Sequence, residues 1–304
     1  MSGHVPVMLG EVLALLAPKA GEHYVDGTFG GGGYARAILE AADCRVLGID
    51  RDPDAIARGQ DLVKHFAGRL TLVQGAFSQL EELFGAGRTD GVVLDLGVSS
   101  FQFDAPERGF SFQGNGPLDM RMSRTGETAA DFVNGADEKT LSGVIFRLGE
   151  ERNARRIARA IIDRRPVTET AELAAIVKDA QGPAAARFAI HPATRTFQAL
   201  RIHVNDELGE LERGLEAASN ALAPNGRLVV VAFHSLEDRI VKRYLGARST
   251  AVPKGSRHAP ETGRAHDAQF RLLTSRPLSP SESEVHANPR ARSARLRAAQ
   301  RLAA

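Results

Sequence analysis

The chain has 304 residues, of which 43% are apolar and 25% are charged, and this composition excludes an intrinsically disordered protein. Its length suffices for one large core or two modest ones. Cys44 is the only cysteine, which excludes an intramolecular disulfide and a cysteine-based metal cluster and fits a reducing cytoplasm. The apolar stretch 5–17 contains Glu11, lacks a basic leader and is too short to cross a bilayer. We therefore expect a cytoplasmic protein without a membrane partner.

Arginine is unevenly distributed along the chain, although the net charge of +2 is too small to indicate a nucleic-acid partner by itself. Two groups stand out: Arg147, Arg152, Arg155, Arg156, Arg159, Arg164 and Arg165 in one, and Arg290, Arg292, Arg295, Arg297 and Arg301 in the other. Such groups are equally well explained as solvated helix faces or as contacts for RNA phosphates.

The first third of the chain alternates between short apolar runs and helical segments. The apolar runs resemble buried parallel strands and lie at 23–26, 45–50, 70–75 and 91–96. Between them, Asp52 followed by Pro53 is typical of a capped helix start, and Ser78 with Glu81 predicts a capping box. This alternation predicts an α/β fold with a parallel sheet and helices on both faces.

A long interruption follows the fourth predicted strand, because the next comparable run is 226–233. The interval contains a loop rich in Gly, Pro and Asp and helical patterns at 150–163 and 170–180. We expect residues 193–222 to form one helix that leads back into the sheet, and 250–268 to form a surface loop.

These segments predict a domain organisation in three parts. Residues 1–124 form the first part of the main domain, and 125–190 form an inserted small helical domain. Residues 191–304 complete the main domain and end in a basic C-terminal tail.

A glycine-rich turn follows the first predicted strand, with the sequence Asp26-Gly27-Thr28-Phe29-Gly30-Gly31-Gly32-Gly33. Consecutive glycines let the backbone come close to a ligand, and ligands bind at the carboxyl edge of a parallel sheet. The turn lacks the Gly-Lys-Ser/Thr ending of a P-loop, so no lysine meets a triphosphate. It therefore predicts a nucleotide-type cradle.

Two acids accompany this turn. Asp50 ends the second strand, where a carboxylate accepts hydrogen bonds from both ribose hydroxyls of an adenine nucleoside. These features alone do not separate S-adenosylmethionine from a nicotinamide dinucleotide, because Gly30, Gly32 and Ala35 also fit a loose G-x-G-x-x-A pattern. Asp26 favours S-adenosylmethionine, because an acid before the turn repels a pyrophosphate but suits the ammonium group of a methionine moiety.

Longer motifs extend over essentially the whole chain. They lie at 4–8, 26–33, 48–53, 94–100, 108–112, 116–122, 191–202, 233–239 and 290–297, and include Leu94-Asp95-Leu96-Gly97-Val98-Ser99-Ser100 and Phe233-His234-Ser235-Leu236-Glu237-Asp238-Arg239. Together they resemble the MraW/RsmH methyltransferases. One departure is Tyr34, where the family usually has histidine.

The resemblance implies a class I, Rossmann-like methyltransferase sheet with an inserted helical domain. It also implies transfer of a methyl group from S-adenosylmethionine to the exocyclic N4 of a cytidine in the decoding region of 16S ribosomal RNA, within the small subunit. The resemblance does not decide whether the protein forms a homodimer. Cofactor contacts carry over to Gly32, Gly33, Tyr34, Asp50, Phe77, Asp95 and Gln102, and the glycine turn adds Gly30.

The chemistry predicts which side chains activate the acceptor. The methyl sulfonium is already activated, so no metal is needed, and the nine histidines are scattered without ligand spacing. The amino lone pair of cytosine is delocalised, so acceptors that hold its N–H groups promote attack. Our candidates are Asp95 and Asp119, with Ser99 or Ser100 assisting and His234 and Asp238 shaping the pocket. Structural hydrogen bonding explains these residues equally well.

Three alternatives remain at this level. One is a methyltransferase acting on another amino group, such as adenine N6. A nicotinamide-dependent oxidoreductase is disfavoured by Asp26 and by the lack of an obvious hydride-transfer pair. A non-catalytic RNA-binding assembly factor is disfavoured because a scaffold would not require Asp50, Asp95 and the glycine turn.

Overall fold

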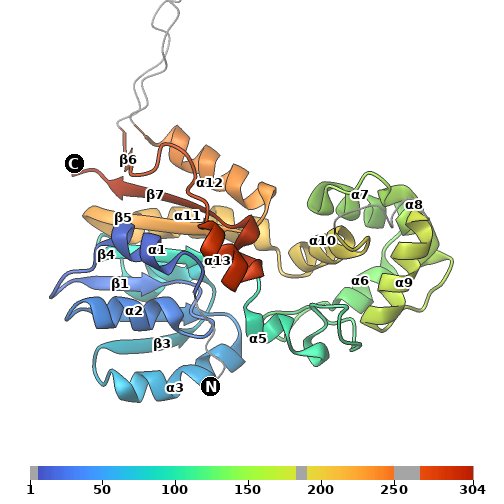
Figure 1. The fold of residues 1–304 in the computed structure, drawn as a ribbon, viewed down its shortest axis with the longest axis horizontal. Helices are drawn as coiled ribbons and strands as arrows, with labels where there is room; N and C mark the ends of the chain where they lie inside the picture. Colours follow the sequence, from blue (N-terminus) through green and yellow to red (C-terminus); the bar gives the residue numbers. More distant parts are fainter. Residues whose placement is uncertain (1–5, 183–189, 250–267, 304) are drawn as a thin grey trace, which may run out of the picture. The chain divides into compact units, whose positions relative to one another are not determined.

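A computed structural model describes residues 6–182, 190–249 and 268–303 (Figure 1). The chain forms two compact units, one made of Met1–Gly97 with Leu208–Ala304 and the other of Val98–Glu207. Residues 4 and 5 of the first motif and nearly all of the expected loop 250–268 lie outside the described residues. In the described part, no helix combines the length and apolar character needed to cross a membrane.

The first unit contains a seven-stranded sheet with the order β3-β2-β1-β4-β5-β7-β6. The strands are β1 (His23–Asp26), β2 (Arg45–Asp50), β3 (Leu70–Gln74), β4 (Thr89–Asp95), β5 (Leu222–Ala232), β6 (Phe270–Leu272) and β7 (Arg295–Arg301). Neighbouring strands from β3 to β5 are parallel, whereas β7 runs antiparallel to both β5 and β6. The carboxyl ends of β1, β2, β4 and β5 therefore meet at one edge of the sheet.

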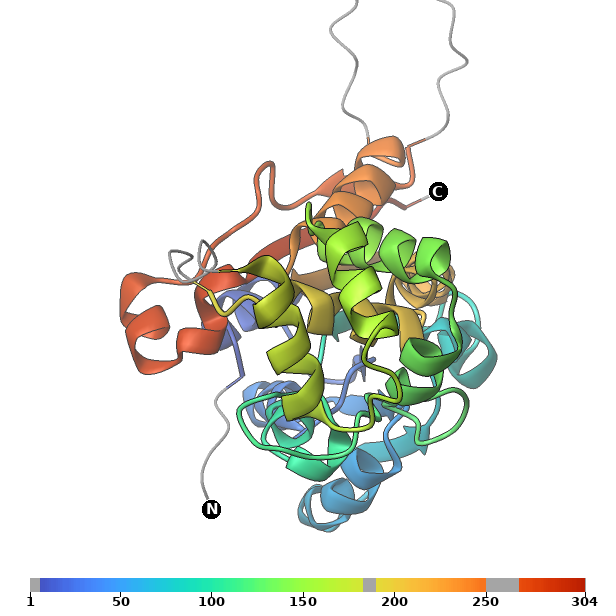
Figure 2. The same cartoon turned by 90° about the vertical axis from the view of Figure 1, so that its right-hand side faces the viewer.

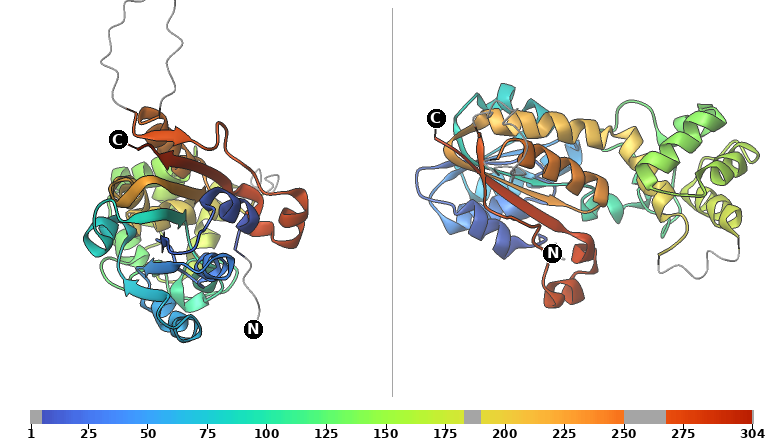
Figure 3. Two further views of the ribbon diagram at one scale, coloured as in Figure 1. Left: turned by 90° about the vertical axis from the view of Figure 1, so that its left-hand side faces the viewer. Right: turned by 90° about the horizontal axis from the view of Figure 1, so that it is seen from above.

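Helices cover both faces of this sheet, as the two views of Figure 3 show. They are α1 (Leu9–Leu16), α2 (Gly33–Ala41), α3 (Pro53–His65), η1 (Phe77–Gln79), α4 (Leu80–Phe84), α11 (Glu207–Ala221), α12 (Ser235–Ala247), α13 (Glu282–Ala287) and η4 (Pro289–Ser293). Because side chains alternate along a strand, Val229 and Val231 enter one core with α1 and α2, and Leu228 and Val230 enter another with α11 and α12.

The local patterns predicted the first strands well. Strands at 23–26 and 45–50 are confirmed to the residue, and the others agree within a few residues. Asp52 caps α3 by accepting the backbone N–H of Asp54 at 3.0 Å, as predicted. The capping box assigned to Ser78 is wrong, because Ser78 lies inside η1, whose N-cap position is Ala76.

Two other predictions about the main domain are wrong. The single helix expected at 193–222 is divided into α10 (Thr194–Val204) and α11, since Asp206 has a φ of 47° that interrupts the helix. The parallel sheet is the second, because residues 295–301 of the basic tail form β7, which runs antiparallel to its neighbours. The sheet is therefore not entirely parallel.

The second unit is helical, and it faces the viewer in Figure 2. Its elements are α5 (Ser100–Phe103), η2 (Pro106–Arg108), α6 (Ala129–Gly135), α7 (Glu138–Gly149), α8 (Ala154–Ile162), α9 (Thr170–Gln181) and α10. The helix predicted at 150–163 begins later, since Glu150 adopts a left-handed conformation after α7. The helix predicted at 170–180 is confirmed and ends at Gln181, with Gly182 as its C-cap.

This unit extends beyond the 125–190 predicted for the insert. The loop before α6 contributes Leu118 and Met120 to the same apolar core as α7 to α10. The Asn205 side chain accepts the N–H of Met122 at 2.8 Å and donates to the carbonyl of Met120 at 2.7 Å. These hydrogen bonds join the loop to the end of α10, so both belong to the helical unit.

Candidate functional site

The glycine turn connects β1 to α2 and is shaped by close contacts. Gly32 has a φ of +74°, and a Cβ there would lie 2.7 Å from the Phe29 ring. The Phe29 ring also lies 2.7 Å from where a Cβ of Gly48 would stand. A Cβ at Gly33 would lie 2.2 Å from Cγ of Pro6, so the N-terminal segment crosses the start of α2. The turn therefore requires glycine for both its conformation and its packing.

Asp26 ends β1 and is fully buried under the turn. Its carboxylate accepts the backbone N–H of Ala35 at 3.1 Å and that of Thr28 at 3.3 Å. Burial raises the pKa of Asp26 to about 7, although these two hydrogen bonds oppose the rise. The carboxyl group thus holds the turn against the first residues of α2.

Asp50 ends β2, as predicted, and touches the same turn. Its Oδ2 accepts the N–H of Gly30 at 2.7 Å, and its Oδ1 accepts the N–H of Asp52 at 2.8 Å. Burial raises the pKa of Asp50, and the backbone hydrogen bonds oppose this. Each carboxylate oxygen has a second lone pair, so the group retains acceptor capacity for a ligand.

Asp95 ends β4, and its backbone N–H donates to Oγ1 of Thr28 at 2.7 Å. Its carboxyl is buried, and Oδ1 has no hydrogen-bond partner among the described residues. Burial raises the pKa of Asp95 well above its usual range, and the charges of Asp26 and Glu237 raise it further. An unpartnered buried acceptor is costly unless a ligand supplies a donor or a positive charge.

Tyr34 and Phe77 flank this edge of the sheet. The Tyr34 ring is buried, and its hydroxyl donates to the carbonyl oxygen of Val7. Burial raises the pKa of this hydroxyl, and the nearby Asp95 and Asp26 act in the same direction. Phe77 begins η1 after β3, and its side chain packs close to Gly27 and Gly214. Both predicted contacts therefore border the glycine turn or its acids.

His234 and Asp238 follow β5 but are held by other protein groups. His234 is the N-cap of α12, where its Nδ1 accepts the N–H of Glu237 at 3.4 Å; its buried Nε2 lies 3.1 Å from Oε1 of Glu237 but makes no hydrogen bond among the described residues. Both Asp238 oxygens accept from the guanidinium of Arg297, at 2.7 and 3.0 Å. These contacts support a structural role for Asp238, while its predicted contribution to a pocket stays a prediction.

The remaining predicted residues belong to the second unit. Ser99 caps α5 and accepts the N–H of Gln102 at 3.3 Å, while Oε1 of Gln102 accepts the N–H of Ser99 at 3.0 Å. Ser100 is the first residue of α5. Asp119 forms a bidentate pair with Arg121, at 2.8 and 2.7 Å. Partial burial alone would raise the pKa of Asp119, but the hydrogen bonds and charge of Arg121 outweigh it and lower the pKa.

Two residues of this site were not singled out from the sequence. Thr28 lies within the glycine turn, and only its position between Asp26 and the glycines signalled a role. Glu237 is buried, and its Oε2 accepts the N–H groups of Phe233 and His234 at 2.7 and 3.2 Å. The His-x-x-Glu spacing directly after a strand, typical of a capping box, was the available signal.

The first unit fits an adenosyl cofactor that carries positive charge. The turn is built from glycines that a Cβ would disturb, and three carboxyl groups from β1, β2 and β4 converge beside it. Asp95 Oδ1 is a buried acceptor without a protein donor among the described residues. Carboxylates in this position favour an ammonium or a sulfonium and repel a pyrophosphate.

Comparisons with known proteins agree with this chemistry. The model of the MraW methylase family matches residues 1–302. A ribosomal RNA small subunit methyltransferase H from Hyphomonas neptunium is 57% identical over 305 residues, covering 98% of this chain and 89% of that one. The protein of the same name from Acidiphilium cryptum is 55% identical, with 100% of both chains covered.

A solved rRNA methylase from Streptococcus thermophilus is 9% identical, covers 99% of this chain and 100% of its own, and has a TM-score of 0.46. So distant a likeness adds nothing to the assignment, which rests on the sequence matches. Because the family model spans nearly the whole chain, including the glycine turn, Asp50 and Asp95, this chain belongs to the MraW methylase family.

Proposed function

We propose that this chain transfers a methyl group from S-adenosylmethionine to the exocyclic N4 of a cytidine in 16S ribosomal RNA of the small subunit, in the cytoplasm. The observation that carries the proposal is the unpartnered buried carboxyl of Asp95 beside the glycine turn. The names of the relatives support rRNA as the acceptor. The motifs shared with MraW/RsmH methyltransferases support the cytidine N4.

The residues of the first unit have distinct roles in holding the cofactor. Gly30, Gly32 and Gly33 bring the backbone close to it, and Asp50 accepts from the ribose hydroxyls. Phe77 provides an apolar surface beside the turn. Asp26 and Asp95 place negative charge where a methionine ammonium and a sulfonium require it. Tyr34 closes the turn by holding the carbonyl of Val7.

Methyl transfer requires little covalent chemistry from the protein. The N4 lone pair attacks the methyl carbon, the carbon–sulfur bond breaks, and S-adenosylhomocysteine leaves with the bonding electrons. The amine then releases one proton. Alignment of the two reactants supplies most of the rate enhancement, and acceptors that hold the N–H groups of the amine draw its lone pair out of the ring. Asp95 is the first candidate for this task, and Asp119, Ser99 and Ser100 are the others.

The experiment that tests the proposal supplies labelled S-adenosylmethionine and small ribosomal subunits from a strain lacking this protein. The modified nucleotide is then mapped and its nucleoside identified. We expect N4-methylcytidine at one position. Methylation of an adenine N6, or of no RNA at all, would contradict the proposal.

The same assay tests the candidate catalytic residues at saturating cofactor. Asp95→Asn and Asp119→Asn are compared with wild type in turnover rate. An unchanged turnover rate for Asp119→Asn removes Asp119 from the list and leaves its pair with Arg121 as its role.

A further inference from the structure

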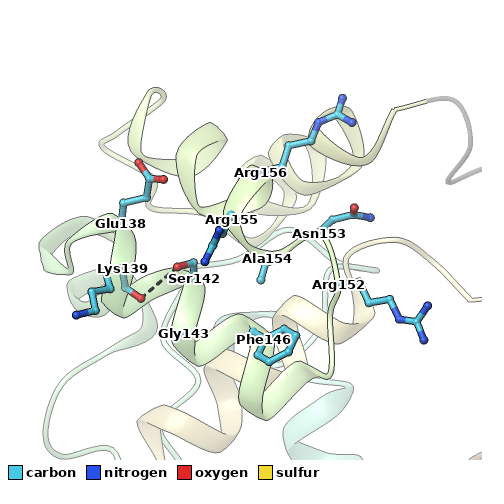
Figure 4. Close-up of a pocket in the computed structure, with 10 residues that line it drawn as sticks. All are labelled: Glu138, Lys139, Ser142, Gly143, Phe146, Arg152, Asn153, Ala154, Arg155 and Arg156. Atoms are coloured by element: carbon cyan, nitrogen blue, oxygen red, sulfur yellow. Dashed lines mark hydrogen bonds between the residues drawn. The ribbon is translucent and has the colours of Figure 1, made fainter.

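A cavity of about 820 Å³ lies within the second unit, between α7 and the start of α8 (Figure 4). Its lining comes from one stripe of α7, which includes Lys139, Gly143 and Phe146, and from residues 152–156 at the turn into α8. Its size falls within the range of about 300–1,000 Å³ that is typical of small-ligand pockets. None of the residues assigned above to the cofactor or the acceptor lines it.

The lining surface is mostly apolar, but several of the residues that form it are basic. Lys139, Arg152, Arg155 and Arg156 contribute positive charge, and Glu138 is the single carboxylate among the lining residues. Oε2 of Glu138 lies 3.9 Å from Nε of Arg159, so this negative charge is already offset by a neighbour outside the lining. Within the described residues, Arg152, Arg155 and Arg156 form no ion pair with a carboxylate. The charges of Arg152 and Arg155 therefore remain available to an anionic ligand, whereas Arg156 is directed away from Phe146 (Figure 4).

Phe146 provides a large apolar surface beside these charges. Its side chain is 59% exposed, the highest value among the exposed large hydrophobic residues of the described part. The opposite face of α7 buries Leu141, Val144 and Ile145, so core packing does not account for Phe146. Gly143 lies one helical turn before it, and a Cβ there would meet no atom within 4 Å. Packing therefore does not require glycine at this position, and its missing side chain leaves the cavity open.

We propose that this cavity binds one unstacked nucleotide of the RNA substrate, with its base stacked on Phe146 and its flanking phosphates near Arg152 and Arg155. An exposed aromatic ring next to arginines is how proteins hold single-stranded nucleic acid, because every base offers a π-face and every linkage carries a charge. The inference rests on the proposed function, since it takes ribosomal RNA as the occupant. This nucleotide is bound within the helical unit, and it is a different nucleotide from the one that receives the methyl group.

The direct test uses fluorescence, because the chain contains no tryptophan. Phe146→Trp places a single reporter in the cavity of the full-length protein. It is titrated with a cytidine hexanucleotide and with a ribose-phosphate hexamer that lacks bases. We expect the cytidine oligomer to quench the tryptophan in a saturable way and the abasic oligomer to bind without quenching. The proposal is overturned if both oligomers quench the tryptophan equally, if poly-aspartate quenches it, or if neither oligomer quenches it.

The second test uses binding and methyl transfer together. Base stacking on an aromatic ring predicts that Phe146→Ala weakens binding of the cytidine oligomer about tenfold. Gly143→Met fills the cavity and should raise the KM for ribosomal RNA by a similar factor, with kcat and S-adenosylhomocysteine affinity unchanged. Arg152→Ala and Arg155→Ala should each reduce the slope of log K against log salt by about one.

Two matched controls lie in the first unit. Leu83→Ala removes another exposed apolar side chain, and Arg45→Ala removes an exposed arginine at the amino end of β2. Both should leave RNA binding and the salt slope unchanged. If wild-type protein methylates ribosomal RNA while the cavity variants keep a normal KM, the cavity proposal fails and the proposed function stands. If the tryptophan is quenched by RNA but no methyl is transferred, the proposed function fails and the cavity proposal stands.

Discussion

The backbone N–H of Asp95 donates to the hydroxyl oxygen of Thr28 at 2.7 Å, which connects the end of β4 to the glycine turn after β1. The same turn is held from β2 by Asp50, whose carboxylate accepts the N–H of Gly30. Three strand ends therefore fix one loop. Such a loop is preorganised for its ligand, because little conformational entropy remains to be lost on binding.

Replacing Thr28 tests this connection. Thr28→Val keeps the shape of the side chain but leaves the N–H of Asp95 without its acceptor. We expect the free energy of unfolding to fall by about 1–3 kcal/mol, the usual cost of an unsatisfied buried donor. S-adenosylhomocysteine should also bind more weakly, as measured by calorimetry. Thr28→Ser keeps the hydroxyl and is the control; equal losses in the two variants would assign the effect to packing instead.

The raised pKa of Asp26 predicts that stability depends on pH. The carboxyl has a pKa of about 7 in the folded chain and an ordinary value of 3.8, so the folded state binds more protons between these values. Its stabilising contribution is complete below pH 4 and is lost as pH rises through 7. Asp26→Asn should therefore unfold at higher urea concentration than wild type at pH 8, with a smaller difference at pH 5.

The same substitution at Asp61, whose side chain is 92% exposed, controls for the loss of a surface charge. If the free energy of unfolding of Asp26→Asn changes in parallel with that of wild type from pH 5 to pH 8, the pH dependence does not come from Asp26.

The acids beside the turn should also distinguish the two forms of the cofactor. S-adenosylmethionine carries one more positive charge than S-adenosylhomocysteine and therefore favours the ionised state of Asp26 and Asp95. Because burial raises both pKa values, binding of the cation releases protons. We expect the ratio of the two affinities to increase in favour of S-adenosylmethionine from pH 6 to pH 8. Calorimetry in buffers of different ionisation enthalpy measures the released protons, and a ratio independent of pH would exclude this coupling.

Two glycines of the turn should not tolerate a methyl group. An alanine at Gly32 would require a φ of +74° and a Cβ 2.7 Å from the Phe29 ring, and one at Gly33 would displace Pro6. Each substitution should lower the melting temperature and weaken S-adenosylhomocysteine binding by about 5- to 150-fold, which corresponds to strain energies of about 1–3 kcal/mol. Gly246→Ala in α12, where a Cβ meets nothing within 4 Å, is the control and should be neutral or slightly stabilising.

Substitutions in the ion pair between Asp238 and Arg297 can distinguish a structural role of Asp238 from a catalytic one. A double-mutant cycle with Asp238→Ala and Arg297→Ala should give a coupling energy of about 1–3 kcal/mol in unfolding experiments. If the pair only joins α12 to β7, Asp238→Asn should keep its turnover rate at saturating cofactor and RNA. A large loss of kcat without loss of stability would instead support the predicted place of Asp238 in the pocket.

Much of the first unit could be predicted because its signals are local. A buried strand needs only a short apolar run, so β1 and β2 were placed to the residue. The acids Asp26, Asp50 and Asp95 could be assigned to one edge because parallel strands present their carboxyl ends together. The family motifs then indicated which ligand such an edge serves.

Only the tertiary structure decided which partners the polar side chains have. The sequence left open whether Arg297 and Arg301 face solvent or RNA phosphates, but Arg297 pairs with Asp238, 59 residues away in sequence, and Arg301 donates to carbonyls around Ser219. Asp119 likewise has a guanidinium beside it. An arginine in the sequence carries the same charge whether it faces solvent or a carboxylate, because its environment is set by chain segments brought together by folding. Sequence therefore determined the sheet, the glycine turn and the acids at its edge, whereas folding determined which charges remain available for RNA.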